Sequence, residues 1–260
     1  MDLGIKGKTA LVLGASQGLG RAIAMGLAAE GVNIAVVARR AEKLEALKAE
    51  AEALGVSVTT HVVDLSDRAS VDAFAEVVKD EIKPDIMLSN AGGPPPSMAL
   101  GVAPEVWRAS TETMLFSIIT LTEAALVSMR ERGWGRIVAI GSSGIVQPIP
   151  TLAVSNTVRG AVAGYYKSLS NQIAKDGVTV NMVLPGRVHT ERIEQLDAAR
   201  AEREGTDVAS VRDASVGEIP AGRLGKPEEF AAVAVFLMSE QAGYVTGQMT
   251  RIDGGAVRGL

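Results

Sequence analysis

The sequence predicts an α/β protein built on one doubly wound parallel sheet of about seven strands, with helices on both faces. Short aliphatic runs alternate with longer amphipathic stretches along all 260 residues, which is the pattern of a parallel sheet with helical crossovers. Most of the runs lack polar alternation, as strands covered on both faces do. The expected strands are Thr9–Leu13, Asn33–Ala38, Val56–Val63, Asp85–Ser89, Arg136–Ile140, Val178–Leu184 and Gln248–Ile252.

Helices are expected between these strands because apolar residues recur there at helical spacing, as in Leu44, Leu47 and Ala51. Each such stripe can pack on one face of a sheet. No repeat or linker divides the chain, so residues 1–260 are expected to form a single domain. Residues from about 190 to 217 are the least regular and most charged part after the sixth strand. That position predicts a mobile lid over a ligand.

Composition narrows the function classes. With 47% hydrophobic and 22% charged residues, the chain can bury a large core. Its net charge of -4 comes from intermixed charges, so no basic face for nucleic acid is expected. Without cysteine and with only His61 and His189, no metal site is expected. No apolar run reaches the roughly 18 residues of a membrane span, so we expect a cytoplasmic protein without a membrane partner.

A glycine-rich turn follows the first strand and opens an alanine-rich helix. The segment runs from Gly14 through Gly18 to Gly20, with spacing G-x-x-x-G-x-G. Small residues let the backbone approach a pyrophosphate, whose charge is met by free N–H groups and the helix dipole. This spacing differs from the general dinucleotide fingerprint. The glycines alone are therefore also compatible with a tight strand-to-helix turn that binds nothing.

Further motifs along the chain belong, together with this turn, to the sequence pattern of one known protein family. They are Asp64-Leu65, Asn90-Ala91-Gly92, Gly135-Arg136-Ile137-Val138, Asn181, Pro185-Gly186, Thr190 and Asp253-Gly254-Gly255. Over essentially its whole length, the chain resembles the short-chain dehydrogenase/reductase family, and particularly the bacterial 3-oxoacyl-carrier-protein reductase type. The resemblance implies a Rossmann-type fold. It also implies a homotetramer that forms through the helices containing Met114 and Ser155.

The resemblance implies a nicotinamide dinucleotide cofactor. Gly14, Gly18 and Gly20 would hold its pyrophosphate, and Thr190 would lie near the nicotinamide carboxamide. Asp64 would contact the adenine or, alternatively, cap the next helix, and Asn90 would order the site or simply bridge neighbouring strands. The full implied set is Gly14, Ser16, Gln17, Gly18, Leu19, Gly20, Arg39, Arg40, Asp64, Leu65, Asn90, Ala91, Gly92, Arg159, Pro185, Gly186, Val188 and Thr190.

The end of the second strand bears on the choice between NAD and NADP. A carboxylate there would bind the ribose 2′-OH and repel a 2′-phosphate. The position is Ala38, followed by Arg39-Arg40, which can form charge-assisted bonds to a phosphate. NADP is therefore favoured. If Arg39 only stacks on the adenine and Arg40 is solvated, NAD is equally acceptable.

Three of the four positions that carry catalysis in the resembled family are substituted. That family uses an asparagine, a serine, a tyrosine and a lysine, which the spacing places at Met114, Ser142, Ser155 and Arg159. Only the serine is retained. Gly160, Ala161 and Gly164 fall where the family carries them, so the register is not slipped. These positions make Ser142, Ser155 and Arg159 the candidate catalytic residues.

The substitutions change the available proton chemistry. A serine hydroxyl is a far weaker acid than tyrosine, whose pKa is about 10. Arg159 can hold the ribose or an alkoxide but cannot join a proton shuttle. Ser155 could bind a carbonyl oxygen beside Ser142, with the proton arriving from water. Histidine is the residue type that ordinarily serves as an acid or base near neutral pH, which makes His189 a candidate proton donor. An ordinary loop histidine is nevertheless the favoured interpretation.

Tyr165 and Tyr166 lie about 15 Å further along the helix than the expected tyrosine. We interpret them as packing residues. Two hypotheses then follow from the sequence. The favoured one is an NADP-dependent oxidoreductase acting on a small-molecule carbonyl or secondary alcohol, of which a 3-oxoacyl compound is one example. The alternative is a catalytically silent nucleotide-binding protein, such as a redox sensor or a partner subunit.

Overall fold

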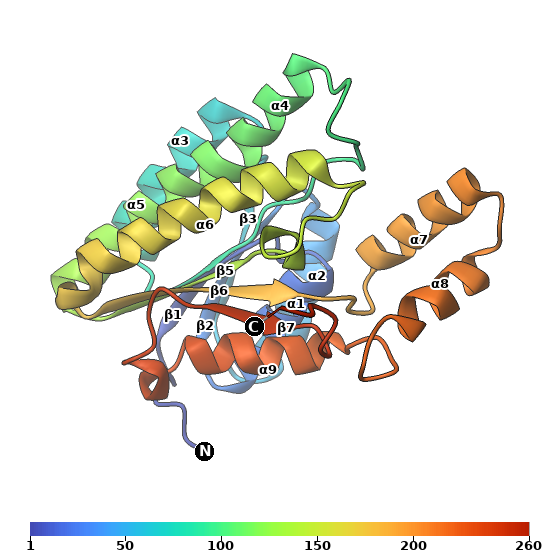
Figure 1. The fold of residues 1–260 in the computed structure, drawn as a ribbon. Helices are drawn as coiled ribbons and strands as arrows, with labels where there is room; N and C mark the ends of the chain where they lie inside the picture. The colour runs from blue at the N-terminus through green and yellow to red at the C-terminus, as the bar shows by residue number, and fades with distance from the viewer. Residues whose placement is uncertain (260) are drawn as a thin grey trace.

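The computed structural model describes residues 1–259 and contains one parallel seven-stranded sheet (Figure 1). The strands are β1 (Thr9–Leu13), β2 (Asn33–Ala38), β3 (Val58–Val62), β4 (Ile86–Ser89), β5 (Gly135–Ile140), β6 (Val178–Pro185) and β7 (Met249–Ile252). Each predicted strand is present, with bounds within two residues of the expected ones. The prediction of a doubly wound, Rossmann-type parallel sheet is confirmed.

The strand order, β3-β2-β1-β4-β5-β6-β7, reverses direction at β1. Leu13 at the end of β1 aligns with Val37 of β2, while Val12 aligns with Leu88 of β4. The chain leaves β1 and β4 toward opposite sides at their carboxyl ends. In open parallel sheets this switch point leaves a crevice where ligands bind. The topology therefore places the glycine turn, which follows β1, at the edge of the sheet where a site is expected.

Helices cover both faces of the sheet. They are α1 (Gly18–Ala29), α2 (Ala41–Glu52), α3 (Arg68–Val77), α4 (Pro104–Thr111), α5 (Ser117–Arg132), α6 (Ala153–Ile173), α7 (Glu191–Glu204), α8 (Val208–Gly217) and α9 (Pro227–Leu237). Short π turns are η1 (Val78–Ile82) and η2 (Glu112–Phe116), and 3-10 turns are η3 (Ser143–Ile145), η4 (Ala174–Asp176) and η5 (Glu240–Ala242).

Two apolar cores hold these layers together, one on each side of the sheet. Helices α3, α5 and α6 bury residues such as Phe74, Leu121 and Tyr166 on one face. Helices α1, α2 and α9 bury Leu27, Leu44 and Phe230 on the other. Figure 1 shows α3 to α6 gathered above the sheet and α9 below it. Alternate residues of the inner strands point into alternate cores, which is why these strands are continuous apolar runs in the sequence.

The stretch Pro104–Arg132, comprising α4, η2 and α5, is long and apolar enough to cross a membrane by length and composition. Half of its most apolar window is buried inside the protein. Its buried residues, including Ile118 and Met129, belong to the core beneath α3 and α6. Its apolar character is thus explained by packing in the core.

The segment from 190 to 217 is regular, contrary to the sequence expectation. It forms α7 and α8, which extend beyond the carboxyl end of β6 (Figure 1). The Thr190 side chain caps α7, and Gly205, with φ +66°, ends it. Only Asp197 and Ala201 of α7 are buried. The helix has no broad apolar stripe, so its periodicity was not visible, and its caps and charged pairs stabilise it instead.

Candidate active site

A cleft of about 1700 Å³ follows the carboxyl edge of the sheet between the main body and α7. Every sequence-predicted catalytic and cofactor residue lines it. These are Gly14, Ser16, Gln17, Gly18, Leu19, Gly20, Arg39, Arg40, Asp64, Leu65, Asn90, Ala91, Gly92, Ser142, Ser155, Arg159, Pro185, Gly186, Val188 and Thr190. The fold thus brings residues from seven separate segments of the chain to one surface.

The glycine turn forms a cradle that only small residues can make. Gly14 and Gly18 have φ values of +65° and +57°, which L side chains rarely adopt. A Cβ on Gly20 would lie 2.3 Å from the Gly14 carbonyl oxygen. The Gln17 side chain makes no capping bond to α1, which leaves the first N–H groups of that helix facing the cleft. A pyrophosphate fits this arrangement because it supplies the missing acceptors.

Asn90 supports the cradle from the neighbouring strand. Its Nδ2 donates to the Gly14 carbonyl oxygen at 3.4 Å, which connects the segment after β4 to the one after β1. The same Nδ2 would lie 2.5 Å from a Cβ on Gly14. Asn90 therefore both bridges neighbouring strands and fixes the turn, so the two interpretations drawn from the sequence are compatible.

The end of the cleft beside β2 and β3 combines two cations with one carboxylate. Arg39 and Arg40 follow the end of β2, and among residues 1–259 neither forms an ion pair. Asp64 Oδ1 accepts hydrogen bonds from the Ser66 N–H at 2.9 Å and its hydroxyl at 2.8 Å, and these lower the pKa of Asp64. Asp64 does not cap α3, because Asp67 does. The Asp64 carboxylate instead orders the loop that borders the cleft.

The two candidate serines lie on different elements of the cleft wall. Ser142 follows β5, and its Oγ accepts from the Gly144 N–H at 3.0 Å. Ser155 lies in the first turn of α6 and is largely buried. Asn156, which sequence reasoning did not select, donates to the Ile149 carbonyl oxygen at 2.8 Å. Its Oδ1 would lie 2.3 Å from a Cβ on Gly144, so it packs beside the Ser142 turn.

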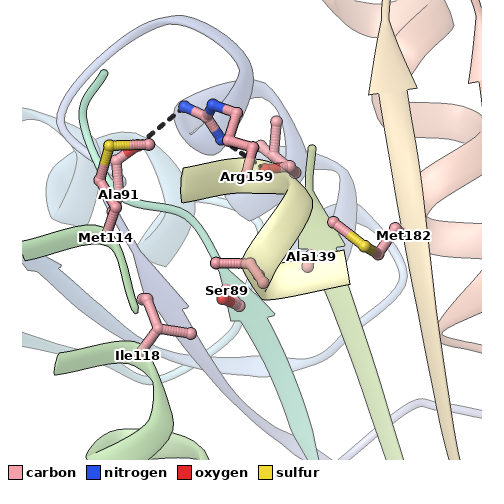
Figure 2. A pocket seen from close by; sticks show the side chains of 9 residues that line it. Ser89, Ala91, Met114, Ile118, Ala139, Arg159 and Met182 are labelled. Carbon is pink, nitrogen blue, oxygen red and sulfur yellow. Dashed lines mark hydrogen bonds between the residues drawn. The ribbon is translucent and has the colours of Figure 1, made fainter. Parts of the chain in front are cut away.

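Arg159 reaches from α6 across the ends of two strands. Its Nη1 donates to the Ile140 carbonyl oxygen at 2.9 Å and its Nη2 to the Ala91 carbonyl oxygen at 3.3 Å (Figure 2). Burial, together with the charge of Arg192, lowers the pKa of Arg159 to about 10. The group is therefore a cation at neutral pH. It can stabilise negative charge but cannot exchange a proton during turnover.

Met114 lies at the centre of the π turn η2 and is buried. A small cavity below Arg159 is lined by Ser89, Met114, Ile118 and Met182, among others (Figure 2). The Met114 thioether supplies no hydrogen-bond donor there. The place that the resemblance assigns to a relay donor is therefore apolar.

The tyrosines lie outside the cleft. Tyr166 is buried, shares a hydrogen bond of 3.0 Å with Thr122 Oγ1, and has a pKa raised to about 12 by burial. Tyr165 is partly buried and packs against the same core. The interpretation of both as packing residues is confirmed. His189 lies outside the cleft as well, 3.3 Å from a carboxylate oxygen of Glu194, so it is a loop histidine.

The most important residue that sequence reasoning missed is Arg192. It lies in the first turn of α7 and lines the cleft. Its Nη2 donates to the Pro94 carbonyl oxygen at 2.9 Å. The sequence shows only an arginine two positions after Thr190. That this arginine lines the cleft follows from helix α7, which the sequence analysis does not predict.

The geometry of the cleft fits a dinucleotide, and the comparisons with known proteins are consistent with that. A family model described as Enoyl-(Acyl carrier protein) reductase matches residues 14–257. The chain belongs to the short-chain dehydrogenase/reductase family. Among its curated relatives, 3-oxoacyl-[acyl-carrier-protein] reductase FabG of Escherichia coli is 32% identical over 97% of this chain and 98% of its own.

Solved structures give the same result. L-sorbose reductase from Gluconobacter frateurii, complexed with NADPH and L-sorbose, has a TM-score of 0.93 and 33% identity, with all of both chains covered. YwfH, an NADPH-dependent reductase involved in bacilysin biosynthesis, has a TM-score of 0.93 and 28% identity, covering 98% of this chain and 100% of its own. Family membership supports oxidoreductase activity for the chain.

Proposed function

We propose that this protein is an NADPH-dependent reductase of small-molecule carbonyl compounds, with the oxidation of a secondary alcohol as its reverse reaction. One observation carries the proposal: the glycine cradle, Arg39 and Arg40 line the same cleft as Ser142, Ser155 and Arg159. The relatives whose structures contain NADPH support the choice of cofactor. When bound, NADPH would supply the hydride.

The residues of the cradle would bind the cofactor by its charges. The glycine turn and the start of α1 would hold the pyrophosphate, because free N–H groups and the helix dipole meet there. Arg39 and Arg40 would bind the 2′-phosphate by charge-assisted hydrogen bonds, which favours NADP over NAD. Thr190 would orient the carboxamide. The close approach of Gly20 to the Gly14 carbonyl oxygen, which leaves no room for a Cβ, supports this assignment.

The substrate carbonyl would be held by hydroxyl groups. Ser142 and Ser155 would donate to the carbonyl oxygen, and Arg159 would stabilise the negative charge that develops on it. Because neither a tyrosine nor an asparagine relay is present, the proton would come from water in the open cleft. Arg159 would also hold the nicotinamide ribose. These roles need positioned dipoles and one cation but no side chain that titrates near neutral pH.

The direct test is NADPH oxidation, measured with a panel of ketones, aldehydes and 3-oxoacyl thioesters. We expect turnover of at least one class, and a loss of turnover in Ser142→Ala with NADPH affinity retained. Ser143→Ala is a matched control, because Ser143 belongs to the adjoining turn η3. Tight NADPH binding without hydride transfer to any compound would refute the proposal.

A second function is supported because Met114, Ser155 and Arg159 together replace the asparagine, tyrosine and lysine of the family pattern. A catalytically silent nucleotide-binding protein, either a redox sensor or a partner subunit, would need only the cradle. The double substitution Ser155→Tyr with Arg159→Lys discriminates between the two functions. Turnover in that variant but not in the native protein supports the silent function, whereas robust native turnover excludes it.

We also propose an oligomeric state, a domain organisation and a cellular location for the protein. A homotetramer would form through α4, α5 and α6, where Phe116 and Val127 are exposed apolar residues. Residues 1–260 would act as a single domain, with α7 and α8 as the lid over the cleft. The protein would be cytoplasmic and would have no nucleic-acid, membrane or metal partner. The intermixed charges and the absence of cysteine support this assignment.

A further inference from the structure

Two arginines meet at one point of the cleft. A Cβ on Gly93 would lie 3.6 Å from Nη2 of Arg192 and 3.8 Å from Nη2 of Arg159. The two guanidinium groups therefore approach the same loop from different elements, α7 and α6. Each donates to a backbone carbonyl oxygen of that loop, Arg192 to Pro94 and Arg159 to Ala91. Their positions are thus fixed by the fold.

Most other arginines in this part of the cleft are neutralised. Arg187 pairs with the buried Asp197, and Arg200 and Arg203 both pair with Glu204. These pairs all involve carboxylates of α7 itself. By contrast, neither Arg159 nor Arg192 forms an ion pair within the described residues 1–259.

Two neighbouring cations without a carboxylate are unfavourable in a partly buried place. Burial lowers the pKa of Arg192, and burial together with Arg192 lowers that of Arg159. The three backbone carbonyl dipoles that the two arginines contact reduce this cost but do not balance two charges. An anion placed between the guanidinium groups would remove it, and arginine binds carboxylates through paired N–H donors. The arrangement is therefore that of an anion site.

The first turn of α7 indicates which anion. Thr190 faces the glycine turn, since its side chain lies 3.6 Å from a Cβ placed on Gly18. Glu191 pairs with Lys43, which also contacts Gln17 of that turn. Arg192 instead contacts Pro94. It thus lies away from the pyrophosphate cradle and toward the part of the cleft left for the substrate.

We propose that the substrate carries a carboxylate that binds between Arg159 and Arg192, so that the enzyme reduces oxo acids. The proposal rests on the proposed function. Ser142 and Ser155 line the cleft with Arg159 and would hold the reacting carbonyl. Pro94, Leu152, Ile193 and Leu196 line the same cleft and would contact an apolar body of the substrate. Arg192 is then a specificity-determining residue supplied by the lid.

The test compares acids with their methyl esters. Native protein and Arg192→Gln are assayed with 2-oxohexanoate, 3-oxohexanoate and 4-oxopentanoate and with the three esters. A charge-assisted hydrogen bond contributes about 1.5 to 3 kcal/mol. The ratio of kcat/KM for acid over ester should therefore fall roughly 10- to 100-fold in Arg192→Gln, by the conversion of about 1.4 kcal/mol per tenfold. Arg192→Lys should restore part of the ratio.

Arg203→Gln is the matched control, because it removes one charge from the same helix and the same cleft and should leave the ratio unchanged. The dissociation constant of NADPH is measured in every variant. A weaker NADPH complex in Arg192→Gln would mean that a cofactor phosphate is the anion, and would overturn the proposal. An equal loss for acid and ester would overturn it as well.

The proposal and the underlying function fail in different ways. If no compound is turned over, the reductase function is refuted. The anion site is then tested by titration calorimetry of 3-oxohexanoate into the NADP-loaded protein. Binding that weakens at least tenfold in Arg192→Gln supports the site. No measurable binding of any of the three acids overturns it.

Discussion

Replacing Gly20 with alanine should separate cofactor binding from folding. The φ of Gly20 is an ordinary negative one, so alanine there meets no backbone strain, and alanine favours helix over glycine by about 1 kcal/mol. The added Cβ, however, would lie 2.3 Å from the Gly14 carbonyl oxygen and 2.9 Å from Asn90 Nδ2. Real Cβ atoms do not approach backbone so closely, so the turn must move by about 1 Å, at roughly 1 to 3 kcal/mol.

That movement would displace the N–H groups that, in the proposed function, hold the pyrophosphate. We expect the NADPH dissociation constant of Gly20→Ala to rise about 10- to 100-fold, since about 1.4 kcal/mol corresponds to tenfold. The midpoint of thermal unfolding without cofactor should fall by only a few degrees, at about 2 to 4 °C per kcal/mol for a chain of this size. NADPH fluorescence titration and calorimetry measure the two effects.

Gly164→Ala is the control for this prediction. Gly164 also lies in a helix, α6, but it does not line the cleft, and a Cβ there has no atom within 4 Å among the described residues. This variant should bind NADPH nearly as the native protein does. If Gly20→Ala also binds NADPH with native affinity and keeps its unfolding midpoint, the cradle does not hold the pyrophosphate and the assignment of the cleft is wrong.

Three further outcomes are expected. Arg39→Gln combined with Arg40→Gln should raise the NADPH dissociation constant at least about tenfold, leaving that of NADH unchanged; equal weakening of both would contradict the 2′-phosphate assignment. Ala161→Arg, on the exposed face of α6, should convert the proposed tetramer into smaller species on light scattering, and an unchanged mass would exclude α6 from the interface. Hydrogen bonds from Arg223 and the Lys226 N–H hold the pKa of Glu229 at about 2. Because that pKa is below its unfolded value, the stability advantage over Glu229→Gln should be complete above about pH 5 and disappear as the pH falls toward 2, measured by thermal unfolding; a difference independent of pH would refute this origin.

The five inner strands of the sheet were predictable because they are buried on both faces, so aliphatic runs alone give their positions. The β3 strand shows the limit. Val56 and Ser57 were included in the predicted strand, but the Ser57 N–H bonds to the Asn33 side chain, so the strand begins at Val58. Helix α7 was missed because charged pairs and caps stabilise it without an apolar stripe. A method based on hydrophobic periodicity cannot detect such a helix.

The candidate site follows the same division. The glycine turn could be located from the sequence because its glycines follow an aliphatic strand at a fixed spacing, and the structure places it in the cleft. Its contact with a pyrophosphate stays a prediction. Arg192 was not predictable, since its partner, the Pro94 carbonyl oxygen, is 98 residues away in the sequence. The contacts of Arg159 with Ile140 and Ala91 are likewise between distant segments. The sequence shows that an arginine is present, but only the structure shows which groups it contacts and that no carboxylate pairs with it among the described residues.

In the π turn η2, the hydrogen bonds that fix the backbone do not involve the residue at the expected relay position. Ser117 Oγ lies 2.7 Å from the Leu65 carbonyl oxygen, beyond β3, and 3.0 Å from the Glu112 carbonyl oxygen within the turn, so its one proton is shared between two acceptors. This hydroxyl therefore links the widened turn to the loop that follows β3. Met114, at the middle of the turn, takes no part in either bond. The hydrogen bonds that hold the widened turn therefore do not depend on the Met114 side chain, so a polar residue of similar size at that position would add a donor to the small cavity below Arg159 without removing either bond.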